Sequence, residues 1–180
     1  MKKFFVFIIF ITIGCSVQVR TAYDHRNNFK KYRNFCWLES CEFTFSGPSY
    51  LNDTLVRGNM QRAIKAEMKV KGLDFNPNTP DLLMDVHVTL ETDTAFIYHG
   101  TGDEPLFFPT FSEPERVLSL KGTLVIDLVD QKTAKMVWRS VAVSYFDIHP
   151  DLTEKNIRKG VSAALKGFPP KLTAVASNVQ

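Results

Sequence analysis

The 180-residue sequence lacks the signatures of the common cofactor-binding and nucleic-acid-binding proteins. It contains no P-loop or dinucleotide fingerprint, and its four histidines and three cysteines do not have the spacing of a metal site. Apart from one run near the N-terminus, no apolar stretch approaches membrane-spanning length. The 22 basic residues are scattered among 19 acidic ones, which leaves no cationic face for nucleic acid. We therefore expect no cofactor, no metal and no nucleic-acid partner.

What is present is the composition of one ordinary globular domain, with 44% hydrophobic, 23% charged and 12% aromatic residues. A chain of this length buries a single core and has no room for two domains and a linker. The densest basic cluster, Lys30, Lys31 and Arg33, is interpreted as a solvated entry to a strand.

The N-terminus has the architecture of a bacterial export signal. Lys2 and Lys3 precede a ten-residue run, 4–13, that is apolar except for Thr12. A helix of ten residues is about 15 Å long, half of the ~30 Å hydrocarbon core, so this run is too short for a permanent transmembrane helix. We predict that residues 1–14 are a signal peptide that is removed from the mature protein.

Cys15 follows this run and is the predicted lipid attachment site. Ile13-Gly14-Cys15 is similar to the bacterial lipobox, in which the cysteine thiol is diacylated and becomes the mature N-terminus. Thr12 stands where leucine is more usual, so ordinary signal cleavage is the alternative. Acyl chains such as palmitate, each buried methylene contributing about 0.8 kcal/mol, would hold the protein on a membrane without crossing it. The absence of an acidic residue at 16–18 favours the outer membrane, with the domain facing the periplasm, and residues 15–28 are interpreted as a lipidated tether.

Export would place the other two cysteines in an oxidising compartment, where disulfides form and persist. Cys36 and Cys41 are five residues apart, so on one straight strand their side chains would point to opposite faces. A disulfide between them requires the strand to end near Glu39 and Ser40. The alternative is two independent, half-buried thiols.

The first half of the domain predicts a strand followed by a helix. The aromatic segment 29–37 indicates the strand, and a turn at Gly47-Pro48 follows it. Apolar residues then recur at helical spacing as far as Lys71, and Gly72 supplies a left-handed helix end. The candidate N-caps are Asn52, Asp53 and Thr54, and the apolar stripe is Val56, Met60, Ala63, Ile64 and Met68.

The middle of the chain predicts three strands. Apolar residues alternate with polar ones over 82–90 and again over 120–128. A polar break at 130–133 then leads into 136–146, which favours a hairpin with Trp138 adding bulk to the sheet.

A second helix follows, because Asp151 and Glu154 fit a capping box and an apolar stripe continues to Phe168-Pro169-Pro170. The predicted order is β-α-β-β-β-α in one domain, 29–172, with a C-terminal tail at 173–180. A strand-helix-strand start implies a right-handed crossover with a parallel pair, and the hairpin adds antiparallel neighbours. We expect a two-layer α/β (α+β) sandwich, with a mixed sheet of about four strands and two helices on one face.

Several segments resemble those of a known family in their order and spacing. They are Phe29-Lys30-Lys31-Tyr32, Phe35-Cys36-Trp37, Asp81-Leu82-Leu83, the run 122–130 with Val137-Trp138-Arg139, and Lys166-Gly167-Phe168-Pro169-Pro170-Lys171. Over about residues 20–172 the chain is similar to the domain of unknown function 4136 lipoproteins of bacterial envelopes. It departs from them at Cys36, where a small residue is more usual, and at Ser140, where glycine often stands. The resemblance implies an exported, lipid-anchored α/β domain and supplies no catalytic residues.

Asp85 and His87 form the candidate acid–base pair, because residues two apart on a strand share a face. The other residues expected on that face of the sheet are Thr89, Thr123, Val125 and Asp127. A solvated sheet face normally carries such residues, and nothing in the sequence places a serine or cysteine nucleophile beside the pair. His25, His99 and His149 are interpreted as solvated loop histidines.

The segment 92–119 is predicted to be a 28-residue connection that holds several aromatic residues and three prolines. Connections of this length are usually functional or disordered, and this aromatic content argues against disorder. The segment either folds back over the core or presents Phe107, Phe108 and Phe111 as an apolar patch to a partner or to lipid headgroups.

The leading hypothesis is a non-enzymatic envelope lipoprotein that is anchored through Cys15 and binds another envelope component or itself. The alternative is a small periplasmic enzyme or ligand carrier that uses the sheet face near Asp85 and His87. The sequence identifies neither the partner nor the oligomeric state nor the pathway.

Overall fold

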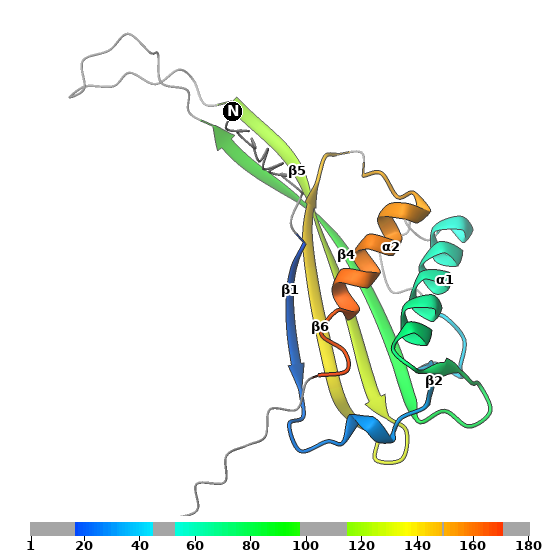
Figure 1. Ribbon diagram of the computed structural model, residues 1–180. Helices are drawn as coiled ribbons and strands as arrows, with labels where there is room; N and C mark the ends of the chain where they lie inside the picture. Colours follow the sequence, from blue (N-terminus) through cyan, green and yellow to red (C-terminus); the bar gives the residue numbers. More distant parts are fainter. Residues whose placement is uncertain (1–16, 45–52, 98–114, 149, 171–180) are drawn as a thin grey trace, which may run out of the picture.

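The computed structural model describes residues 17–44, 53–97, 115–148 and 150–170, which form one mixed sheet with both helices on the same face (Figure 1). The six strands of the described chain lie in the order β1-β6-β5-β4-β2-β3. The elements are β1 (Gln18–Tyr23), the 3-10 helix η1 (Phe29–Lys31), β2 (Asn34–Trp37), α1 (Thr54–Val70), β3 (Asp74–Phe75), β4 (Leu82–Ile97), β5 (Glu115–Asp130), β6 (Lys135–Phe146) and α2 (Glu154–Leu165).

The sheet is mixed, as expected. Strand β2 pairs in parallel with β4, which confirms the parallel pair predicted around the first helix, and also with β3. All other pairs are antiparallel, including the predicted β5–β6 hairpin. The α+β class and the two helices on one face are therefore correct.

The expected count of about four strands is wrong, and the main addition is β1. It lies in the segment 15–28, which was expected to be a tether, and it pairs with the outer edge of β6 from Gln18 opposite Val143 to Tyr23 opposite Trp138. Most of its side chains are exposed, so hydrophobic patterning gives little signal for it. Backbone hydrogen bonding to an open sheet edge, which the sequence does not encode directly, is what forms this strand.

The first predicted strand, 29–37, is also corrected. Its first part is the 3-10 helix η1, which Asn28 caps by accepting a hydrogen bond from the Lys30 amide, and only Asn34–Trp37 is strand. The side-chain hydrogen bond of Asn28 favours a helical turn over extended structure. The aromatic residues of the segment favoured a strand, so the cap was not recognised.

Helix α1 agrees with the prediction at both ends. The Asp53 carboxylate caps it by accepting from the amides of Leu55 and Val56, and Gly72 has a φ of +84°, the left-handed conformation that favours glycine.

Helix α2 is present, but its predicted capping box is wrong. Thr153 is the N-cap and makes no side-chain cap hydrogen bond, while the Asp151 carboxylate accepts from the Thr153 amide and from the side chain of Asn156. The helix ends at Leu165 rather than 168, although Phe168 still packs into the core at 2% exposure.

The long connection expected at 92–119 is shorter than predicted, because its two ends continue β4 and β5 as a paired ladder. Thr92 lies opposite Leu120, and Ile97 lies opposite Glu115. Strand β6 stops at Phe146, opposite Leu120, so beyond this row the described sheet is a two-stranded arm. Figure 1 shows this arm projecting past the two helices.

The core fills the space between the helices and the sheet. The even-numbered residues of β4 near its start, such as Met84, are buried there, and Trp138 is 1% exposed, as its predicted role in the sheet requires. The largest fully buried side chains are Trp37, Trp138, Phe35, Ile64, Met68, Leu82, Met84, Ile126, Leu128, Leu165, Val161 and Cys36.

Candidate functional site

The sheet face opposite the helices carries the acid–base pair suggested by the sequence. Strand pairing sets Asp85 opposite Asp127 and His87 opposite Val125, and the next row pairs two threonines. The prediction that these residues share one face is therefore confirmed. His87 Nε2 lies 2.7 Å from Asp85 Oδ2, and the histidine side chain is 44% exposed.

Arg139 joins this face from β6, opposite Asp127, and was not among the residues predicted for it. Its guanidinium donates two hydrogen bonds of 2.6 Å to the two carboxylate oxygens of Asp127. These hydrogen bonds, followed by the charge of Asp127 and then that of Asp85, raise the pKa of Arg139. The outward position of Arg139 follows from the inward Trp138 next to it, because neighbouring strand residues alternate between faces.

The contacts between side chains on this face limit the chemistry that it can perform. Asp127 is held by Arg139 and Asp85 is in contact with His87, so both carboxylates have partners. The residue opposite His87 is Val125, which has no nucleophilic atom. Two open surface grooves lie elsewhere on the described chain, one between the helices around Ser162 and one beside Phe43, and neither is lined by Asp85 or His87.

The other three histidines were predicted to be isolated, solvated residues and not metal ligands. His25 packs its ring against Tyr23, with 4.3 Å between ring centroids, whereas His99 and His149 lie outside the described residues. Within the described ranges, no group of three or more His, Cys, Asp and Glu side chains is placed to hold a metal ion.

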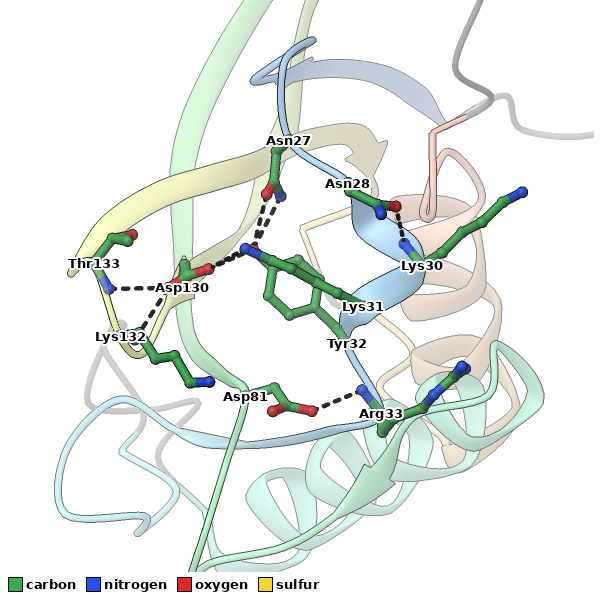
Figure 2. Close-up of polar contacts among 10 residues, drawn as sticks. All are labelled: Asn27, Asn28, Lys30, Lys31, Tyr32, Arg33, Asp81, Asp130, Lys132 and Thr133. Atoms are coloured by element: carbon green, nitrogen blue, oxygen red, sulfur yellow. Dashed lines mark hydrogen bonds and ion pairs between the residues drawn. The ribbon is translucent and has the colours of Figure 1, made fainter.

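The Asp130 carboxylate, at the turn between β5 and β6, accepts four hydrogen bonds from described residues (Figure 2). Its Oδ2 accepts from Lys31 Nζ and from the Tyr32 hydroxyl, both at 2.8 Å, and its Oδ1 accepts from the backbone amides of Lys132 and Thr133. We call these five residues the Asp130 cluster. Burial raises the pKa of Asp130, but the hydrogen bonds from Lys31, Tyr32 and Thr133 outweigh it, so the pKa lies well below its usual range.

The Asp130 cluster gives Lys31 a different environment from the solvated one that the sequence predicted. The Lys31 ammonium, expected to be solvated, forms an ion pair with Asp130, and its hydrogen bond to that carboxylate raises the pKa of Lys31. The Tyr32 hydroxyl also contacts Asn27, and burial followed by the bond to Asp130 raises the pKa of Tyr32. These contacts connect residues almost a hundred positions apart, which a local pattern does not reveal.

The Asp81 carboxylate accepts hydrogen bonds at the same end of the sheet (Figure 2). Asp81 Oδ2 accepts from the amides of Arg33 and Asn34, and the Asn34 side-chain oxygen accepts from the amide of Asp81. This exchange fixes the start of β2 beside the start of β4. Two segments that carry the family resemblance, at 35–37 and 81–83, pair as strands directly beside this contact.

Cys36 and Cys41 are joined by a disulfide in the structure. Strand β2 ends at Trp37, and the chain then turns back through Ser40 and Cys41, which have φ angles of 49° and 59°. The strand therefore ends between the two cysteines, as the sequence argument for a bridge required.

Four of the candidate residues lie outside the described residues. They are Cys15, the predicted lipidation site, and Phe107, Phe108 and Phe111, the predicted apolar patch. Within the part of the chain that is described, neither helix has the length and hydropathy needed to cross a membrane.

Comparison with known proteins identifies a family and a fold. The family model described as "Domain of unknown function (DUF4136)" matches residues 19–170. No curated protein matches the chain.

Two solved structures match the chain over most of its length. A PDZ domain protein from Parabacteroides distasonis has 17% sequence identity and a TM-score of 0.54, over 87% of this chain and 36% of that one. This chain thus spans about a third of that protein's length, and the likeness shows the fold alone. A PelC dodecamer from Paraburkholderia phytofirmans has 10% identity and a TM-score of 0.47, over 83% of this chain and 95% of that one, which is too distant to support an argument.

Proposed function

The chain belongs to the DUF4136 family, whose function is unknown, and from that starting point we propose that it is a lipid-anchored module of the bacterial envelope. In this proposal acyl chains on Cys15 hold the domain at the outer membrane, facing the periplasm. The domain binds another envelope component or a second copy of itself and catalyses no reaction.

The position of β1 is the observation that carries the proposal. This strand begins at Gln18, three residues after Cys15, and every described element follows it in the chain. Removal of residues 1–14 therefore deletes no part of the described fold. Cleavage before Cys15 would leave an acyl anchor directly at the sheet edge.

The disulfide supports the same compartment. Cys36 and Cys41 are bridged, and such bonds persist in oxidising spaces such as the periplasm rather than in the reducing cytosol. A signal peptide would deliver the domain to that space.

We favour binding over catalysis because the Asp85–His87 pair lies on an open sheet face and not in a cleft. A catalytic base is normally placed within reach of a substrate inside a cleft, whereas His87 lies on an open face where its acidic partner is already in contact with it. The alternative function, a small periplasmic enzyme or ligand carrier acting at Asp85 and His87, rests on that 2.7 Å contact alone.

Metabolic labelling with an alkyne fatty acid tests the proposal. We expect label on the wild-type protein in the membrane fraction, and loss of both label and membrane association in Cys15→Ala. The double variant Cys36→Ser with Cys41→Ser is the matched control and should keep its label. A wild-type protein that is unlabelled and is released by osmotic shock would refute the proposal.

A further inference from the structure

The face of the sheet that packs against the helices continues into the arm, where the helices no longer cover it (Figure 1). On β5, Leu118 and Leu120 have the same parity as the buried Leu128, so they lie on the helix side. Phe96 on β4 and Phe146 on β6 lie on this side as well. We call these four residues, Phe96, Leu118, Leu120 and Phe146, the arm strip.

The arm strip is an apolar surface that no described helix covers. Phe96 is 58% exposed, Leu118 is 42% exposed and Phe146 is 36% exposed, although all three continue a buried face. Gly122 keeps this surface continuous with the core, because a Cβ atom built there would lie 2.6 Å from the Phe146 ring, and glycine leaves that space to the ring.

The start of β1 places the predicted acyl anchor at the same end of the molecule. Val17 packs against the core, and Gln18 lies opposite Val143 on β6. Two residues of chain reach at most about 7 Å, so Cys15 stays close to this point. Phe146 is three residues beyond Val143, or about 10 Å along the strand. A bilayer that holds Cys15 is therefore within reach of the arm strip.

The charges of the arm are divided between its two faces. Strand parity places Asp93, Glu115 and the ion pair of Glu91 with Lys121 on the face opposite the strip, where Ile97 is an exposed apolar residue. Arg116 lies on the strip side, opposite Phe96. A surface with an exposed apolar row and a cation at its end suits the boundary between phospholipid headgroups and acyl chains, with the acidic face turned to water.

We propose that the arm strip is a second membrane contact, which lies in the headgroup boundary of the bilayer that holds Cys15. The inference rests on the proposed function, because the anchor determines which end of the sheet meets the bilayer. A second copy of the chain is a weaker fit, since the strip exposes on the order of 300 Å², whereas a stable interface needs roughly 800 Å² per partner. The arm's open strand edges suit the hydrated headgroup layer rather than the hydrocarbon.

Quenching by brominated lipid tests this contact directly. Residues 16–180, which contain every described element, are held on phosphatidylethanolamine–phosphatidylglycerol vesicles by an N-terminal hexahistidine tag and a nickel-chelating lipid. Phe96→Trp introduces the probe, and Val70→Trp is the matched control, because Val70 is 83% exposed at the C-terminal end of α1. The native Trp37 and Trp138 are buried and supply a constant background.

We expect lipid bromination to reduce the added emission of Phe96→Trp by about half and to leave Val70→Trp unchanged, because an interfacial residue lies near the first acyl carbons. Adding Leu118→Ser to Phe96→Trp should restore most of the emission. Equal emission from Phe96→Trp with and without bromine, on vesicles that carry the protein, overturns the inference. A dimer in sedimentation that Leu118→Ser dissociates would instead assign the strip to a second copy. The tag replaces the acyl chains, so either result is independent of whether Cys15 is acylated.

Discussion

Strands β4 and β5 begin and end in opposite surroundings. At the turn end, Leu82 and Leu128 are fully buried beneath the helices, and the Asp130 cluster joins β5 to η1. At the arm end, Leu118 and Phe96 continue the same face without a described helix above them. One hairpin therefore supplies both fully buried and exposed apolar side chains on the same face, which separates the residues that stabilise the fold from those available for contact.

A leucine pair on β5 gives the largest expected difference between the two ends. Leu128→Ala should lower the free energy of unfolding by about 3–4 kcal/mol, because it removes a fully buried side chain and leaves a cavity. Leu118→Ala, on the same strand and face, should change it by less than about 0.5 kcal/mol. Urea unfolding followed by circular dichroism measures both values, and equal losses would mean that the arm is part of the core.

A carboxylate pair extends the comparison to polar groups. Asp130→Ala should cost about 3 kcal/mol, because it leaves two backbone amides without their acceptor and removes the shorter of the two acceptors of the buried Tyr32 hydroxyl. Asp93→Ala on the arm removes only a local bond to the Thr94 amide and should cost about 0.5 kcal/mol or less. The same urea titrations apply, and a neutral Asp130→Ala would show that the cluster contributes no stability.

The disulfide lies at the turn end and should contribute somewhat less. Replacing Cys36 and Cys41 together by serine opens a very short loop, for which chain entropy predicts a loss of about 2 kcal/mol. Thermal unfolding with and without reductant checks this value. If reductant leaves the wild-type melting temperature unchanged, the bridge does not stabilise the fold.

Acid should weaken the turn end before the arm. The folded-state pKa of Asp130 is lowered, so its stabilisation is present above its unfolded pKa of about 4 and is lost as the pH falls below that value towards the folded-state pKa, by at most about 1.4 kcal/mol per pH unit. Asp130→Asn should flatten this acid dependence. The test is to measure the unfolding free energy of the wild type and of Asp130→Asn from pH 6 to pH 3. Parallel curves for the two proteins would contradict the prediction.

The smallest effect is expected on the open sheet face. His87→Ala removes a half-exposed side chain in contact with Asp85, and such surface pairs contribute about 0.5 kcal/mol or less. The urea midpoint should hardly move. A loss of several times that value would give this pair a structural role that the contacts do not explain.

The sequence predicted the parts of the fold that local chemistry determines. Helix α1 follows from its apolar spacing, Asp53 and Gly72, and the β5–β6 hairpin follows from two alternating runs around a polar turn. Strand β1 was missed because its side chains are mostly exposed and only its backbone pairs with β6. The arm was missed because exposed residues at 92–97 do not alternate as a half-buried strand does.

The site was predictable to a similar degree. The shared face of Asp85 and His87 follows from strand parity, whereas the opposition of Asp127 and Arg139 depends on hairpin register, including the irregularity after Leu128. Asp130 looked like an ordinary turn residue because its partners Lys31 and Tyr32 are distant in the sequence.

The acyl anchor is the claim on which the account depends, and the intact mass of the mature protein from its native envelope tests it most directly. We predict a chain that begins at Cys15 and carries the added mass of a diacylglyceryl group, with or without a further acyl chain. A mature chain that begins at any other residue, with an unmodified mass, would contradict the account.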